Sequence, residues 1–74
     1  MLDSKKIGTV IRQLREEKKL TQDVFSGLAD LDRSHYSKIE RGLRIPTLET
    51  VFKIAQALEI KPSELIRIIE ESQQ

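Results

Sequence analysis

Apolar residues recur at intervals of three and four along most of this chain, and this spacing is the strongest constraint on its fold. Ile7, Val10, Ile11 and Leu14 show the pattern most clearly. Such spacing places apolar side chains on one face of an α-helix, whereas a half-buried strand needs strict alternation, which no segment shows. The chain is therefore predicted to be all-α, a compact bundle of five helices.

Helix-capping residues divide the chain into its elements. Thr21 and Asp32 suit the N-cap position, Asp3 or Ser4 can open the first helix, and Gly42 suits the left-handed position after a helix. Pro62 suits the first turn of the last helix. Helices are expected over about 4–19, 22–29, 33–41, 48–58 and from 62 onward, the fourth being opened by Pro46 and Thr47.

The same periodicity predicts which side chains face the core. Two or more apolar residues on one helix face are expected in each of the middle three helices. The expected core residues are Val24, Phe25, Leu28 and Ala29 in the second helix, Tyr36 and Ile39 in the third, and Leu48, Val51, Phe52, Ala55 and Leu58 in the fourth.

Length and composition limit the class of protein. Residues 1–74 suffice for one domain, and with no cysteine a disulfide framework and a thiolate zinc site are both excluded. Apolar residues never run more than two in a row, so neither a membrane span nor a signal peptide is expected. We expect a cytoplasmic protein with no cofactor, no metal and no small-molecule effector.

Charge is distributed unevenly, although the whole chain carries only +1. Residues 33–46 hold four basic residues against one acidic residue, a local charge of +3, whereas residues 59–74 hold two against four, a local charge of −2. The middle of the chain can therefore meet phosphates, and the end of the chain should avoid them.

The second and third expected helices are separated only by Asp30 to Asp32, a connection that forces two short helices to cross steeply. With Tyr36 and Ile39 inward, the outer face of the third helix carries serine, lysine and arginine. Arg and Lys side chains can donate hydrogen bonds to guanine, and short hydroxyl side chains can pair with either donors or acceptors on base edges. Residues 21–41 are thus predicted to form a helix-turn-helix motif.

The chain resembles the Cro and lambda-repressor-like (XRE) family of helix-turn-helix proteins over nearly its whole length. Five runs carry the resemblance: Ile11-Arg12-Gln13-Leu14-Arg15, Thr21-Gln22, Arg33-Ser34, Ile39-Glu40-Arg41-Gly42 and Pro46-Thr47-Leu48. The chain departs from the family at Ser26, where alanine is usual, and at Asp30, where glycine is usual. Serine is small, and aspartate tolerates a left-handed turn, so neither departure breaks the motif.

The resemblance implies a role for individual residues. Base-reading residues are expected to be Arg33, Ser34, Ser37 and Lys38, and phosphate-binding residues Gln22, Arg41, Arg44 and Thr47. Gln22 is also expected to brace the recognition helix, and Arg15 and Glu40 are expected to form a partly buried ion pair between the first and third helices. His35 is interpreted as half-buried packing, with DNA contact as the less favoured alternative.

The last helix has more apolar surface than a short core needs. Leu65, Ile66, Ile68 and Ile69 spread over roughly 160° of its circumference at about 100° per residue. They are therefore predicted to join two copies in a symmetric dimer. A monomer whose last helix only closes the core is the alternative.

The sequence predicts a regulator of transcription that binds specific double-stranded DNA as a dimer on a pseudo-palindromic operator. It would act as a repressor or as a controller of a restriction-modification system. An antitoxin, or an interaction module that uses the same fold to bind protein, is the alternative. Enzymatic activity is not expected, because no catalytic triad, metal-ligand cluster or cofactor motif is present.

Overall fold

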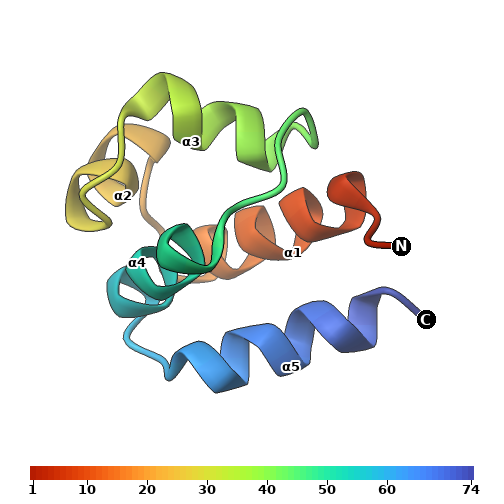
Figure 1. Ribbon diagram of the computed structural model, residues 1–74. Helices are drawn as coiled ribbons and strands as arrows, with labels where there is room; N and C mark the ends of the chain where they lie inside the picture. Colours follow the sequence, from red (N-terminus) through yellow and green to blue (C-terminus); the bar gives the residue numbers. More distant parts are fainter.

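The computed structural model describes all 74 residues and contains five helices and no strand, which confirms the all-α prediction. The helices are α1 (Ser4–Glu17), α2 (Gln22–Leu28), α3 (Arg33–Glu40), α4 (Leu48–Leu58) and α5 (Pro62–Ser72). Helix α3 lies along one side of the molecule, α5 lies on the opposite side, and α1 runs between them (Figure 1). None of the five is long and apolar enough to cross a membrane.

Side-chain caps fix where four of the helices begin. The Asp3 carboxylate accepts hydrogen bonds from the main-chain N–H groups of Lys5 and Lys6, and Thr21, Asp32 and Thr47 cap α2, α3 and α4 in the same way. Each cap satisfies an N–H group that the helix itself leaves unpaired. Helix α5 has no side-chain cap and begins with Pro62, whose missing N–H group needs no partner.

Left-handed residues end or separate the helices. Gly42 has φ +78°, as its position after α3 predicts, and an added Cβ would press on Lys5 of α1. Lys19, Asp30 and Glu59 adopt φ of 59°, 56° and 63° without being glycine. Asp30 therefore does take the left-handed conformation expected of it. The first helix ends at Glu17, two residues before the expected boundary, and the left-handed Lys19 follows it.

One core lies between the helices. Tyr36 and Phe25 pack with ring centroids 5.2 Å apart, joining α2 to α3. The other members come from all five helices and are Ile7, Ile11, Ala29, Ile39, Val51, Ile54, Ala55, Ala57, Leu58, Leu65 and Ile69. Ser26 is buried beside them, as its small size permits.

Two of the expected inward stripes are wrong in part. Val24 and Leu28 of α2 are exposed, and Phe25 and Ala29 alone turn inward. In α4, Leu48 and Phe52 are exposed, while Ile54 and Ala57 are buried in their place. Helix α4 is apolar around much of its circumference, so several stripes satisfy the same spacing. The packing of α4 against α5 and the rest of the fold selects Val51, Ile54, Ala55 and Leu58.

The closest approach between helices brings the backbone of α1 against the end of α3. Gly8 faces this crossing, and a Cβ added there would overlap the main-chain oxygens of Ile39 and Glu40. A side chain at Gly8 would push the two helices apart. The glycine therefore sets the position of α3 relative to α1.

We predict that Gly8→Ala lowers the free energy of unfolding by about 1 to 3 kcal/mol, because the added methyl group overpacks a backbone contact. Gly27→Ala is the control, since an added Cβ meets nothing within 4 Å in α2. That variant should raise stability by about 0.5 to 1 kcal/mol through helix propensity. Urea denaturation measures both, and equal effects of the two substitutions would contradict the close contact.

Candidate functional site

A buried carboxylate joins the first three helices. Arg15 of α1 donates from Nε to Glu40 Oε2 at 2.7 Å and from Nη2 to Oε1 at 3.2 Å. Gln22 of α2 donates to Oε1 at 2.9 Å, and the Tyr36 hydroxyl of α3 donates to Oε2. The Glu40 side chain is 2% exposed, so the ion pair expected from the sequence is present and is more deeply buried than expected.

The hydrogen bonds in this network set the protonation states of its members. Burial by itself raises the pKa of Glu40, but the donors Arg15, Tyr36 and Gln22 favour the carboxylate and bring its pKa below the usual value. The hydrogen bond to Glu40 raises the pKa of Arg15 despite its burial. Burial and the bond to Glu40 raise the pKa of Tyr36. At neutral pH the network is a charged pair with a neutral phenol.

The outer face of α3 forms a polar hollow at the surface. Arg33 and Ser34 come from the first turn of α3, Ser37 from the next turn and Arg41 from just beyond its end. The hollow has a volume of about 540 Å³, and no hydrophobic residue lines it. Three of the four residues expected to read bases thus line one surface, together with Arg41, one of those expected to bind phosphate.

The remaining expected residues lie around this hollow. Lys38 is half-buried beside it, and Arg44 and Thr47 are exposed on the segment that follows α3. The Thr47 hydroxyl accepts from the Thr50 N–H at 3.2 Å and contacts the Thr50 hydroxyl at 3.1 Å, because it caps α4. A phosphate contact at this position would therefore depend on the main chain at the start of α4.

Gln22 is placed between the buried network and the surface. One N–H of its side-chain amide is used by Glu40. An amide group carries two N–H donors, so the second remains for a group outside the protein. The structure thus shows Gln22 bracing α3 against α2, and its expected contact with phosphate stays a prediction.

Sequence reasoning missed two partners in this region. Tyr36 was expected only to pack in the core, yet it also donates to Glu40; the two lie four residues apart in α3, the spacing of helix neighbours. Nothing in the sequence pairs Asp23 with another residue, but its Oδ1 lies 3.0 Å from Arg33 Nε. No sequence pattern reveals this second pair, because it depends on the angle between α2 and α3.

The predicted dimer residues do not all reach the surface. Leu65 is 0% exposed, so its assignment to an interface is wrong: it completes the core. Ile69 is 8% exposed and also belongs to the core, although it lines the apolar pocket described below. Ile66 is 43% exposed, and Ile68 is partly buried. Only part of the apolar arc of α5 is thus free for a partner.

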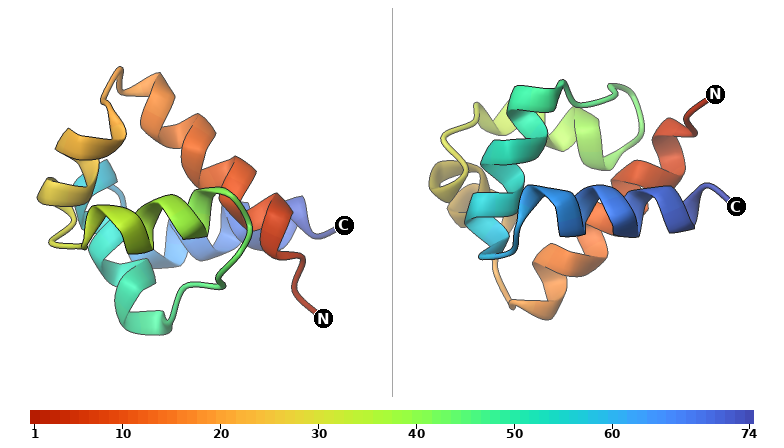
Figure 2. Two further views of the ribbon diagram at one scale, coloured as in Figure 1. Left: turned by 90° about the horizontal axis from the view of Figure 1, so that it is seen from above. Right: turned by 60° about the horizontal axis from the view of Figure 1, so that its bottom comes forward.

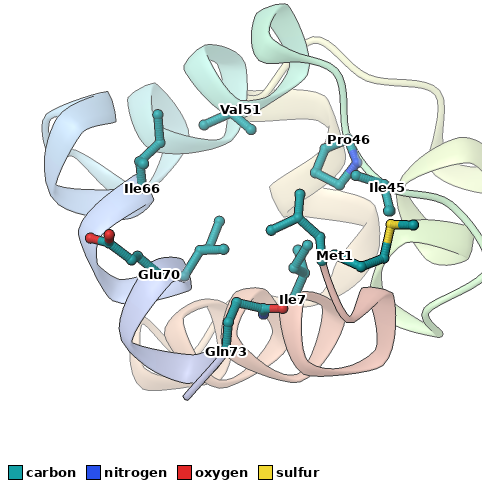
Figure 3. Close-up of a pocket in the computed structure, with 10 residues that line it drawn as sticks. Met1, Ile7, Ile45, Pro46, Val51, Ile66, Glu70 and Gln73 are labelled. Carbon is teal, nitrogen blue, oxygen red and sulfur yellow. The ribbon is translucent and has the colours of Figure 1, made fainter.

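An apolar pocket opens beside Ile66. It has a volume of about 580 Å³ and lies between α5, the first residues of the chain and the segment that leads into α4. Met1, Ile45, Pro46, Ile66 and Glu70 surround it (Figure 3). We call it the lateral pocket. Elsewhere, no group of three His, Cys, Asp or Glu side chains is placed to hold a metal ion.

Two short helices joined through residues 29–32, the second presenting a polar face to solvent, define a helix-turn-helix protein. The chain belongs to the helix-turn-helix family, whose model matches residues 11–65. The resemblance described from the sequence motifs is therefore confirmed.

Three relatives show which members of this family the chain is similar to. The chain is 42% identical to the control protein C.MunI of a Mycoplasma species over 88% of its own length and 89% of that protein. It is 43% identical to the restriction-modification controller protein C.AhdI from Aeromonas hydrophila, with a TM-score of 0.81 over 85% of this chain and 96% of that one. It is 28% identical to the controller protein C.Esp1396I, a tetramer in complex with its 35-base-pair operator, with a TM-score of 0.84 over 97% and 95% of the two chains.

The low pKa of Glu40 predicts a pH-dependent stability. Its ionised form is favoured in the folded state, so the stabilisation is complete above the unfolded pKa of about 4.3 and is lost as the pH falls through the lower folded value. Glu40→Gln removes the charge and should cost about 3 kcal/mol at neutral pH, because Arg15 is left without its partner.

Denaturant titrations between pH 7 and pH 3 measure this effect. The difference between wild type and Glu40→Gln should shrink on acidification, since protonated Glu40 resembles glutamine. Glu17→Gln is the control, because Glu17 is exposed and forms no ion pair. A Glu40→Gln deficit that stays constant over this range would show that the charge does not stabilise the fold.

Proposed function

We propose that this chain is a regulator of transcription that binds specific double-stranded DNA and inserts α3 into the major groove. The observation that carries the proposal is the polar hollow on α3, in which Arg33, Ser34, Ser37 and Arg41 gather at an exposed surface. Guanidinium and hydroxyl groups suit base edges and phosphates, and the major groove admits one α-helix. The whole of residues 1–74 acts as one DNA-binding domain.

The rigidity of α3 supports this proposal. The inner side of the helix is held by Tyr36, Ile39 and Glu40, all buried, while Arg33 and Ser34 remain exposed on its outer side. Base reading requires side chains on a fixed frame, because a misplaced donor loses its hydrogen bond. The buried network provides that frame.

The relatives support a role as a controller of a restriction-modification system. C.AhdI is a restriction-modification controller protein by name and C.MunI a control protein, and each matches more than four fifths of this chain. A regulator of bacterial genes works in the cytoplasm and needs neither cofactor nor enzymatic activity. An antitoxin or a protein-binding module with the same fold remains the alternative, and neither would necessarily select one duplex sequence.

Selection from random duplexes, followed by salt titration, tests the function. A regulator of this kind enriches one motif and loses affinity steeply as the salt concentration rises, because counterions are released from the phosphates. Failure to enrich any motif, with binding to protein partners instead, would favour the interaction module.

We expect substitutions of base-reading residues and of phosphate-binding residues to change DNA binding in different ways. Arg33→Ala should cost about 1 to 3 kcal/mol on the selected duplex and relax preference at one base pair, because a base contact is lost. Arg44→Ala should weaken binding to all duplexes and reduce the salt slope by about 1, because a phosphate contact is lost. Fluorescence anisotropy on selected and random duplexes separates the two effects, and equal losses for Arg33→Ala on both would disprove base reading.

We also propose that the chain works as a homodimer, and that the lateral pocket forms its interface. Helix α5 lies opposite α3 (Figure 1), so two copies joined back to back through α5 would point their recognition helices away from each other. Seen from above α3, the N-terminus and the segment leading into α4 project to one side of the helix (Figure 2). A dimer joined on this side leaves both copies of α3 on one face of a duplex, about 34 Å apart.

The chemistry of the lateral pocket agrees with this arrangement. Met1, Leu2, Ile45 and Ile66 are exposed apolar residues that line it. Exposed apolar surface that is continuous rather than scattered marks an interaction site. The C.Esp1396I tetramer on its operator shows that a relative assembles from several copies, and we extend that behaviour to this chain.

Ile66→Glu should convert a micromolar dimer into a monomer, because it places a charge within an apolar contact. Leu28→Glu is the control, since Leu28 is also an exposed apolar residue, at 59% against 43% for Ile66, but belongs to α2. Sedimentation equilibrium measures the association, and circular dichroism checks that each variant folds. A monomeric wild type, or equal dissociation of both variants, would exclude this interface.

A further inference from the structure

An exposed ion pair connects the two helices of the motif at the polar hollow. Arg33 is the first residue of α3, and its Nε lies 3.0 Å from Oδ1 of Asp23 in the first turn of α2. The side chains are 58% and 74% exposed. The contact thus orders a long, flexible guanidinium group at the surface where DNA would approach.

Asp23 is the only acidic residue that lines this hollow, and the residues around it are basic or carry hydroxyl groups. The other lining residues are Arg33, Ser34, Ser37 and Arg41. A carboxylate at a surface that meets phosphates opposes binding through like-charge repulsion. The stability supplied by the ion pair does not account for its presence, because an exposed ion pair contributes little to folding.

A favourable interaction with the start of α2 is the other structural explanation for Asp23. Acidic residues in the first turn stabilise helices by opposing the positive end of the helix dipole. Glu49 holds the same place in α4: each is the second helical residue after a threonine cap. Glu49 has no arginine partner and does not line the hollow, so it provides a comparison within the same chain.

We propose that Asp23 is a positioning residue that determines specificity by fixing how Arg33 is presented to a base. The inference rests on the base-reading function proposed for α3. An arginine has five N–H donors in one plane, and the Asp23 carboxylate lies at the Nε end of that plane, with Oδ1 3.0 Å from Nε. The Nη1 and Nη2 groups remain for guanine O6 and N7, which accept two parallel hydrogen bonds.

The same contact discourages binding to the wrong sequence. Without Asp23, the guanidinium group can turn toward a nearby phosphate on any duplex, because arginine pairs well with phosphate oxygens. With Asp23, that movement breaks an ion pair and brings the carboxylate close to the phosphate. Asp23 therefore lowers affinity for random DNA more than it lowers affinity for the cognate site.

The test compares Asp23→Asn with Glu49→Gln on the selected duplex and on random duplex. Each substitution removes one negative charge at the same helix position with almost no change of shape. For Asp23→Asn, the ratio of the random to the cognate Kd should fall by about threefold to tenfold, as the loss of part of one bidentate contact requires. For Glu49→Gln, the ratio should stay within about twofold, because both affinities change together.

Repeating Asp23→Asn in an Arg33→Ala background shows whether Asp23 acts through Arg33. There the ratio should change by less than about twofold, because the residue that Asp23 positions is absent. A thermal midpoint for each variant checks that the fold is retained. These measurements separate a specificity effect from a general loss of structure.

Two results would overturn the inference. If Asp23→Asn changes the ratio no more than Glu49→Gln does, the ion pair has no role in recognition. Alternatively, an undiminished effect in the Arg33→Ala background would show that Asp23 contacts DNA itself, for example by accepting from a cytosine amino group. If the wild-type protein prefers no duplex sequence, the proposed function itself is wrong. This result is distinct from the two results that would overturn only the role of Asp23.

Discussion

The carboxylate of Glu40 is the interaction on which the arrangement of the first three helices depends. It receives hydrogen bonds from Arg15 in α1, Gln22 in α2 and Tyr36 in α3. Arg15 extends the network further by donating to the main-chain oxygen of Leu20, at the turn between α1 and α2. No buried side-chain nitrogen or oxygen in the chain lacks a partner. A fully satisfied network of this kind fixes one arrangement of helices, whereas apolar packing alone tolerates several.

The hydrogen-bond network around Glu40 and the close contact at Gly8 both fix the position of α3. Gly8 lets the backbones of α1 and α3 approach, and Arg15 lies two turns along α1 on the same side. The first contact fixes the distance between these helices, and the second fixes their rotation. The position of α3 is thereby fixed from its buried side.

Much of this architecture could be predicted from the sequence because it depends on local chemistry. Thr21, Asp32 and Gly42 mark helix ends through backbone hydrogen bonding, which neighbouring residues determine. The inward face of α4 could not be predicted, because its apolar residues surround the helix and only its packing against the rest of the fold, mainly α5, selects among them. The same reason explains why Leu65 was assigned to an interface rather than to the core.

The candidate site also has some features that the sequence predicts and one that it does not. The positions of Arg33, Ser34 and Ser37 on one face follow from helical spacing, and the Arg15–Glu40 pair follows from the family motif. The partnership of Asp23 with Arg33 does not follow from either, since it requires the crossing angle of two helices. Pairs between separate helices are determined by three-dimensional packing that no local pattern encodes.

The separation of the two faces of α3 has a consequence for how relatives can diverge. Tyr36, Ile39 and Glu40 maintain the frame, while Arg33 and Ser34 take no part in the core. Outward positions can therefore be exchanged during evolution with little effect on folding, since surface substitutions change stability by less than about 0.5 kcal/mol. Because Asp23 pairs with Arg33, a change at Arg33 would favour selection of a change at Asp23 as well. Lineages that acquire new target sites should thus alter these two positions together while the residues beneath them persist.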